Sequence, residues 1–199
     1  MKQPASDIAF TDSVKELQRQ AGSRETYERM ESGPGWRTTV DSQLKQFLAG
    51  LDMFYLATAN AAGQPYMQYR GGPAGFLKAL DDKTLGFADY SGNRQYISLG
   101  NLKENPKSLL FLMDYANRRR IKVWGEARVA PEDPALLERL NDPAYPAPPE
   151  RGVLFTVKAW DINCPAHIHP RLLRSEVEDT IQSLRNRIQE LETQLAARS

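Results

Sequence analysis

Six short segments have the length and composition of β-strands, and most of them are apolar runs bounded by turn-forming residues. The expected strands cover residues 53–59, 65–70, 84–88, 108–115, 120–130 and 152–161. Turn-forming residues join the first two at Ala61-Ala62-Gly63, and Gly125 interrupts the alternation of the fifth. We expect a β-bulge or a close backbone approach at Gly125. Six strands with few helices between them predict a mainly β (α+β) fold, an antiparallel barrel with peripheral helices.

Helical periodicity appears before, between and after these strands. A helix ending near Ala49 presents one apolar face, and Gly50 follows it. Other helices are expected at residues 14–20, 23–30, 95–104 and 133–140. The first two belong to an arm with few large apolar residues, which must pack either on the main body or on a partner subunit. We therefore divide the chain into an N-terminal arm (1–36), a barrel domain (37–170) and a C-terminal amphipathic helix (171–199).

The C-terminal helix carries an apolar stripe with the 3.5-residue period of a coiled coil. Its spacings are 4, 3, 4, 3 and 4, from Val177, Ile181, Leu184, Ile188, Leu191 and Leu195. The stripe covers fewer than three heptads, too few for a stable helix on its own. It either lies on its own domain or pairs with a second chain, and we favour pairing because it continues past the last expected strand.

The amino-acid composition excludes only a few classes of function. The chain of 199 residues has a net charge of +1, so no overall field attracts nucleic acid or a membrane surface. No apolar run approaches the roughly 20 residues of a membrane span, and the N-terminus lacks the apolar region of a signal peptide. The single cysteine, Cys164, allows no intramolecular disulfide. These features predict a cytoplasmic protein without nucleic-acid or membrane partners.

Common catalytic and nucleotide motifs are missing. No strand precedes a GxGxxG sequence, and neither a P-loop nor a GxSxG elbow occurs. Cys164, His167 and His169 form a C-x-x-H-x-H set, whose spacing is not a common zinc pattern and which lacks an evident fourth ligand. We favour a packed turn or the edge of a ligand site over a metal centre. The tip Arg118-Arg119-Arg120 is interpreted as a solvated turn from which Arg120 alone points inward.

The most informative segment is the loop that follows the third expected strand. It reads Asp89-Tyr90-Ser91-Gly92-Asn93-Arg94-Gln95 and runs into the start of a helix. Loop amides and a helix N-terminus provide partial positive charge, and Arg94 provides a full one. The loop is therefore a candidate anion site.

The central part of the chain, about residues 40–130, resembles the pyridoxamine 5'-phosphate oxidase superfamily of FMN-binding split barrels. The order and spacing of short segments carry this resemblance: Gly63-Gln64-Pro65-Tyr66, Leu85-Gly86-Phe87, Asn93-Arg94-Gln95, Asn105-Pro106-Lys107 and Arg120-Ile121-Lys122-Val123-Trp124-Gly125. A narrower similarity, through Tyr69-Arg70-Gly71-Gly72-Pro73, is to an oxidase-related flavin-nucleotide-binding branch.

The resemblance implies a six-stranded antiparallel split barrel and a homodimer with FMN at the subunit interface. It assigns Asn93, Arg94 and Gln95 to the FMN phosphate, and Ala88 and Asp89 to the ribityl chain. The strand residues Gln68, Tyr69, Arg70, Gly71 and Gly72 would lie along the isoalloxazine ring, and Arg120 would reach the flavin from the facing strand. Arg70 or Arg120 is the candidate cation for the reduced flavin. Tyr69, Tyr90 and His167 are only candidate acids or bases, so no catalytic residue is assigned.

Departures from the oxidase change the expected chemistry. Gly71-Gly72-Pro73 stands where the oxidase has a substrate-binding lysine, and the oxidase's C-terminal Arg-x-His motif is not matched. The interpretation is an FMN-dependent oxidoreductase acting on a small molecule with a nicotinamide or deazaflavin partner, not a pyridoxamine phosphate oxidase. The alternative is a non-enzymatic flavin-binding or sensing protein that dimerises through its C-terminal helix. A third, weaker alternative is a split barrel that binds haem or another cofactor.

Overall fold

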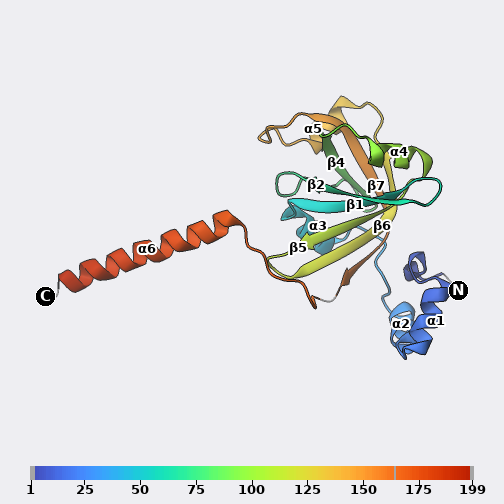
Figure 1. Ribbon diagram of the computed structural model, residues 1–199, viewed down its shortest axis with the longest axis horizontal. Coiled ribbons are helices and arrows are strands. Elements are labelled where there is room, and N and C mark those ends of the chain that lie inside the picture. The colour runs from blue at the N-terminus through green and yellow to red at the C-terminus, as the bar shows by residue number, and fades with distance from the viewer. Residues whose placement is uncertain (1–2, 164, 198–199) are drawn as a thin grey trace. The chain divides into compact units, whose positions relative to one another are not determined.

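The computed structural model describes residues 3–163 and 165–197 of the chain (Figure 1). These residues form two compact units. The larger comprises the described parts of 1–113 and 120–164, and it contains the whole core. The smaller comprises the hairpin tip 114–119 together with the described residues from 165 onward.

The larger unit is built on one antiparallel sheet. Its strands are β1 (Met53–Ala59), β2 (Pro65–Gly71), β3 (Lys78–Ala79), β4 (Thr84–Tyr90), β5 (Lys107–Asp114), β6 (Arg119–Val129) and β7 (Pro149–Asn163). Their order in the sheet is β2-β1-β5-β6-β7-β4-β3, and the described strands do not close into a complete ring. The predicted fold class, a mainly antiparallel split barrel with added helices, is confirmed.

The strand count needs one correction. All six expected strands are present, and β3 is a seventh that the sequence analysis missed. It consists of only two residues, which pair with Gly86 and Leu85 of β4. A segment this short cannot display the alternation by which strands are recognised.

Alternation along the strands builds the core. In β1, Phe54 and Leu56 are almost fully buried, and their partners across β5 are Leu112 and Leu110. The central residues of β4 are all buried, because β4 is covered on both faces. At Gly125 the register of β6 against β7 shifts, and a Cβ atom there would lie 2.1 Å from the carbonyl oxygen of Thr156. The predicted bulge at Gly125 is thus confirmed, and only glycine fits there.

Helices occupy the positions between and beyond these strands. Their bounds are η1 (Ala5–Ile8), α1 (Asp12–Gln20), α2 (Arg24–Ser32), α3 (Ser42–Ala49), α4 (Ile97–Glu104), α5 (Pro134–Leu140) and α6 (Arg174–Ala196). Side chains cap several of them, as when Asp41 accepts a hydrogen bond from the amide of Leu44 at 3.0 Å. In contrast, α4 begins two residues later than expected, because Arg94 and Tyr96 adopt left-handed backbone conformations.

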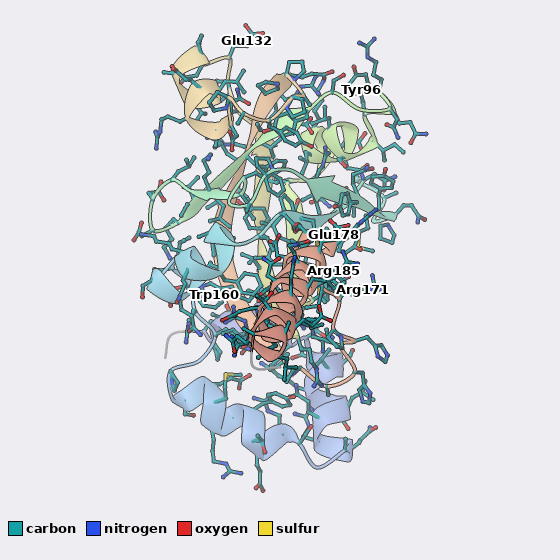
Figure 2. The ribbon with its side chains drawn as sticks, turned by 90° about the vertical axis from the view of Figure 1, so that its left-hand side faces the viewer. Tyr96, Glu132, Trp160, Arg171, Glu178 and Arg185 are labelled. Carbon is teal, nitrogen blue, oxygen red and sulfur yellow. The ribbon has the colours of Figure 1, made fainter. Side chains whose placement is uncertain are left out.

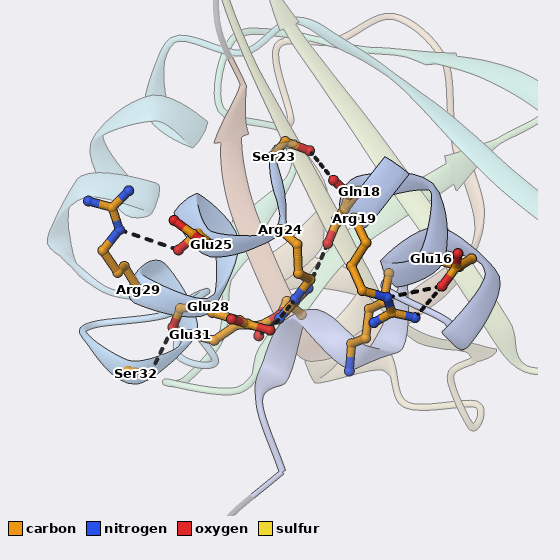
Figure 3. A network of polar contacts seen from close by, with 12 residues as sticks. Glu16, Gln18, Arg19, Ser23, Arg24, Glu25, Glu28, Arg29, Glu31 and Ser32 are labelled. Carbon is orange, nitrogen blue, oxygen red and sulfur yellow. Dashed lines mark hydrogen bonds and ion pairs between the residues drawn. The ribbon is translucent and has the colours of Figure 1, made fainter. Parts of the chain in front are cut away.

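The N-terminal arm is held together by a polar network and packs on its own sheet. The guanidinium of Arg24 donates to Gln18 at 2.6 Å and to Glu28 at 3.0 Å, and it also pairs with Glu31 (Figure 3). The ring of Trp36, at the end of the arm, stacks on Trp124 of β6 with ring centroids 4.5 Å apart. Of the two alternatives for the arm, packing on the main body is therefore the one observed.

Candidate functional site

A cleft of about 150 Å³ lies where the sheet is open. Strand β2 forms one end of the sheet, and beyond Gly86 the strand β4 has no described partner on its β3 side. The facing residues come from β2, from the end of β4 and its loop, from the first turn of α4 and from the start of β7. They are Tyr66, Gln68, Arg70, Asp89, Tyr90, Gly92, Asn93, Arg94, Gln95, Tyr96, Ile97, Ser98, Leu99, Glu150 and Arg151.

A buried carboxylate between two arginines forms the floor of this cleft. Asp89 is 6% exposed, and it accepts hydrogen bonds from Arg70 of β2 and, at 3.5 Å, from Arg151 of β7. Burial raises the pKa of Asp89 above its ordinary value, and the two guanidinium groups offset only part of that effect. The Nε atom of Arg70 is buried and has no hydrogen-bond partner among the described residues.

Arg151 is fixed by several contacts in addition to Asp89. Its guanidinium pairs with Glu150 at 2.6 Å and lies 5.6 Å from the ring centroid of Tyr96. Both arginines on the floor are thus already engaged with carboxylates. They are held in place and are less available to a ligand than an unpaired cation would be.

The loop above the floor is arranged to receive an anion. Arg94 and Tyr96 have φ angles of 58° and 55°, a conformation that is costly for residues other than glycine. Asn93 Oδ1 accepts a hydrogen bond from the Gln95 amide at 3.1 Å, which shapes the turn. Among the described residues, no side chain caps α4, so its first amides are open to another acceptor (Figure 2 labels Tyr96 at this end of α4).

Arg94 is the uncommitted cation of the site. Its side chain is exposed, and it forms no ion pair with any residue in the described part of the chain. It stands beside the uncapped start of α4, where the helix dipole adds partial positive charge. An unpaired guanidinium, free helix amides and a turn with unusual backbone angles together fit a phosphate or a similar anion.

The structure brings together six of the eleven residues that the sequence analysis assigned to the cofactor. Those that line the cleft are Gln68, Arg70, Asp89, Asn93, Arg94 and Gln95. Their assignment to the parts of FMN rests on the resemblance and remains a prediction.

The other five assigned residues do not line this cleft. Tyr69 is 56% exposed on the opposite face of β2, whereas Ala88 is buried in β4. Gly71 and Gly72 follow at the end of β2, and a Cβ atom on Gly72 would lie 2.7 Å from the Phe76 ring. Arg120 lies in β6, and its buried Nε has no described hydrogen-bond partner. Any contact of these residues with a cofactor is likewise a prediction.

The sequence analysis also missed residues that the cleft contains. Arg151 is the most important of them, and it is the cross-strand partner of Asp89 in the β4–β7 ladder. Only the register of two strands about 60 residues apart in sequence reveals this pair. Tyr66 had a local signal, since it shares the alternation of β2 with Gln68 and Arg70.

The other features considered in the sequence add no functional site. Cys164 lies outside the described residues, so the C-x-x-H-x-H set is only partly seen. Within the described residues, no group of three or more histidine, cysteine or acidic side chains is placed to bind a metal ion. None of the described helices combines the length and hydropathy needed to cross a membrane.

The open antiparallel sheet with its peripheral helices defines the class of the protein as a split barrel. Residues 40–164 match the family model described as pyridoxamine 5'-phosphate oxidase, and the chain belongs to this family. The resemblance seen in the sequence is thereby confirmed.

Several solved structures are similar to this chain at low sequence identity. A variant of HupZ from Group A Streptococcus is 17% identical, with 62% of this chain and 99% of that chain covered, at a TM-score of 0.50. A putative pyridoxamine 5'-phosphate oxidase from Lactobacillus delbrueckii is 20% identical over 63% of this chain and 95% of that one, at a TM-score of 0.47. An FMN-binding protein from Syntrophomonas wolfei is 16% identical over 83% of this chain and 100% of that one, at a TM-score of 0.47. A search of curated protein sequences gave no match.

Proposed function

We propose that this chain is an FMN-binding flavoprotein and an oxidoreductase that acts on a small molecule. One observation carries the proposal. In a chain of this family, the unpaired Arg94 and the uncapped start of α4 lie in the same cleft. Arg94, the amides of the loop and the first amides of α4 would hold the phosphate. When bound, FMN supplies hydride and electron transfer, and the protein supplies position and charge.

The size of the cleft bears on the proposed homodimer. Sites that enclose a complete small-molecule ligand usually have volumes of about 300–1,000 Å³. A cleft of about 150 Å³ holds a phosphate group and the start of a ribityl chain, but not a flavin ring. The ring would then extend over the surface of the unit, where a second subunit would cover it. This supports a homodimer with FMN at its interface.

The residues near the end of β2 favour a substrate other than pyridoxamine phosphate. A substrate-binding lysine of the oxidase is replaced here by Gly71-Gly72-Pro73. The ring of Phe76 fills the space that a side chain on Gly72 would need. The ring of Tyr69 likewise occupies the space beside Gly71, so this stretch offers no charged side chain to a substrate phosphate. We therefore propose a different small molecule, with a nicotinamide or deazaflavin as electron partner.

The visible absorbance of the purified full-length protein is the decisive measurement. We expect a flavin spectrum, with FMN identified by the mass of the released chromophore at about one per chain. A haem spectrum, or failure of the protein to bind added FMN, would overturn the proposal. Turnover with nicotinamide or deazaflavin donors above that of free FMN supports the oxidoreductase. Tight FMN binding without such turnover would instead leave a non-enzymatic flavin-binding protein.

A further inference from the structure

Helix α6 presents a continuous exposed apolar stripe. It is a single helix of 23 residues, about 34 Å long at 1.5 Å per residue. Its apolar side chains are between 39% and 67% exposed: Val177, Ile181, Leu184, Ile188, Leu191 and Leu195. A stripe of this kind is stabilised when a matching surface removes it from water, at roughly 25 cal/mol per Å² of apolar area.

The four central residues of the stripe favour two strands, although Val177 at d and Leu195 at a reverse the pattern at its ends. Its spacing places Ile181 and Ile188 at a positions, and Leu184 and Leu191 at d positions, of a heptad pattern. β-Branched residues at a with leucine at d favour parallel dimers over trimers and tetramers. A second copy of the same helix therefore fits this stripe.

Charges beside the stripe select the direction of pairing. Arg187 occupies a g position, and Glu192, five residues later, occupies the following e position. In a parallel dimer these two positions face each other across the interface, once on each side, and they form two attractive pairs. Arg187 is 59% exposed, and its partner within the helix, Glu190, is 53% exposed. That exposed contact is weak enough for Arg187 to turn toward Glu192 of a second helix.

An antiparallel arrangement is disfavoured by the same charges. With the stripes fully overlapped and a packed against d, Arg187 would face its own copy. Glu178 would face Glu192, and Arg185 would also face its own copy. Glu178 and Arg185, both labelled in Figure 2, are seven residues apart in α6, which is about two helical turns. Every charged pair across that interface would be repulsive.

We propose that α6 forms a parallel two-stranded coiled coil with α6 of a second copy of this chain. The polar contacts within the helix leave the stripe uninterrupted. They include Gln182 with Asn186 at 2.9 Å and Thr193 with the carbonyl of Gln189 at 2.8 Å, all at positions outside a and d. A coil of fewer than three heptads is marginal alone. A second contact between the same two chains raises the effective concentration to about the millimolar range and stabilises the coil.

Disulfide trapping in the full-length chain tests both the pairing and its direction. In a Cys164→Ser background, Leu191→Cys places a thiol at a d position, which faces its own copy in a parallel coil. Thr193→Cys places a thiol at an f position on the outer surface and is the matched control. We expect a covalent dimer from Leu191→Cys under mild oxidation, at least tenfold more than from Thr193→Cys. Equal yields from the two variants, or no dimer from Leu191→Cys, would overturn the proposal.

Charge variants in the same trapping background test the direction independently. Arg187→Glu and Glu192→Arg, made singly, each place like charges across a parallel interface twice, and the double variant restores attraction. We expect trapping at position 191 to fall in both single variants and to recover in the double variant. An increase in trapping with Glu192→Arg alone would show that Arg187 does not face Glu192 of the second helix. That outcome, or equal trapping in all four chains, contradicts the proposal.

Discussion

Arg70 of β2 donates a hydrogen bond to Asp89 of β4, although five strand-to-strand steps of the sheet separate β2 from β4. The pair therefore joins the two sides of the opening with side chains where no backbone ladder does. Arg151 supports Asp89 from the neighbouring strand β7. The candidate anion site lies directly over this joint.

The acid response of Asp89 is one testable consequence. Burial raises its pKa in the folded state, so folding favours the protonated carboxyl. The stabilisation associated with this proton is complete below the unfolded pKa, near 3.8, and is lost as pH rises through the folded pKa. In urea unfolding of flavin-free protein, we expect the stability of the native chain relative to Asp89→Asn to increase as pH is lowered toward about 4.

Asp81 provides a control of opposite sign for this measurement. Backbone amides of Lys83 and Thr84 donate to Asp81, both at 2.7 Å, and the pKa of Asp81 is lowered. The native chain should therefore have a higher free energy of unfolding than Asp81→Asn above pH of about 4, and this difference should decline at lower pH. If the stability advantage from Asp89 also declined at low pH, the two guanidinium groups would outweigh burial. The raised pKa assigned to Asp89 would then be wrong.

Removal of the uncommitted cation should weaken cofactor retention. A charge-assisted contact to phosphate contributes about 1.5–3 kcal/mol, so Arg94→Ala should raise the Kd for FMN roughly 10- to 100-fold. The exposed Arg139 at the end of α5 lies outside the cleft, and Arg139→Ala is the matched control. Fluorescence titration of free FMN measures both variants, and equal affinities would remove Arg94 from the phosphate site.

Two glycine substitutions should change stability in opposite directions. Gly125→Ala places a methyl group against the Thr156 carbonyl, and we expect a loss of about 3 kcal/mol or more. Gly100 lies within α4 with open space around it, so Gly100→Ala should stabilise by about 0.5–1 kcal/mol. Chemical denaturation of both variants gives the comparison. A mild effect of Gly125→Ala would mean that the bulge can relax.

The buried arginine of the arm should control local rather than global stability. Arg24→Ala removes the ion-pair partner of the partly buried Glu31, whose carboxylate then keeps only the hydrogen bond from Ser6. We expect proteolysis within residues 12–32 to become roughly tenfold faster, with little change in the unfolding of the sheet. Arg19→Ala breaks only an exposed pair with Glu16 and should leave the cleavage rate unchanged. If Arg24→Ala lowered the stability of the sheet as much as that of the arm, the two would unfold as one unit.

Local sequence signals located most of the strands and the anion loop, and they failed where distant segments meet. β1 was predicted with its observed bounds because its seven residues form an apolar run between turn-forming segments. The late start of α4 was not predicted, since Arg94 and Tyr96 are not residue types that favour left-handed backbone. Arg151 was missed because its relevance arises only from pairing with Asp89. The loop could be recognised from its residues, but the floor beneath it depends on long-range register.

The position of Arg151 in the chain also has a consequence for the order of assembly. β4 pairs with the two residues of β3 and otherwise only with β7, the last strand of the sheet in sequence. Thr84 meets Thr156, 72 positions later, and such long-range pairings form slowly. During synthesis the loop at Arg94 leaves the ribosome well before the segment that completes its floor. The floor of the candidate anion site is therefore among the last features to form, and a chain that ends before residue 149 lacks Arg151.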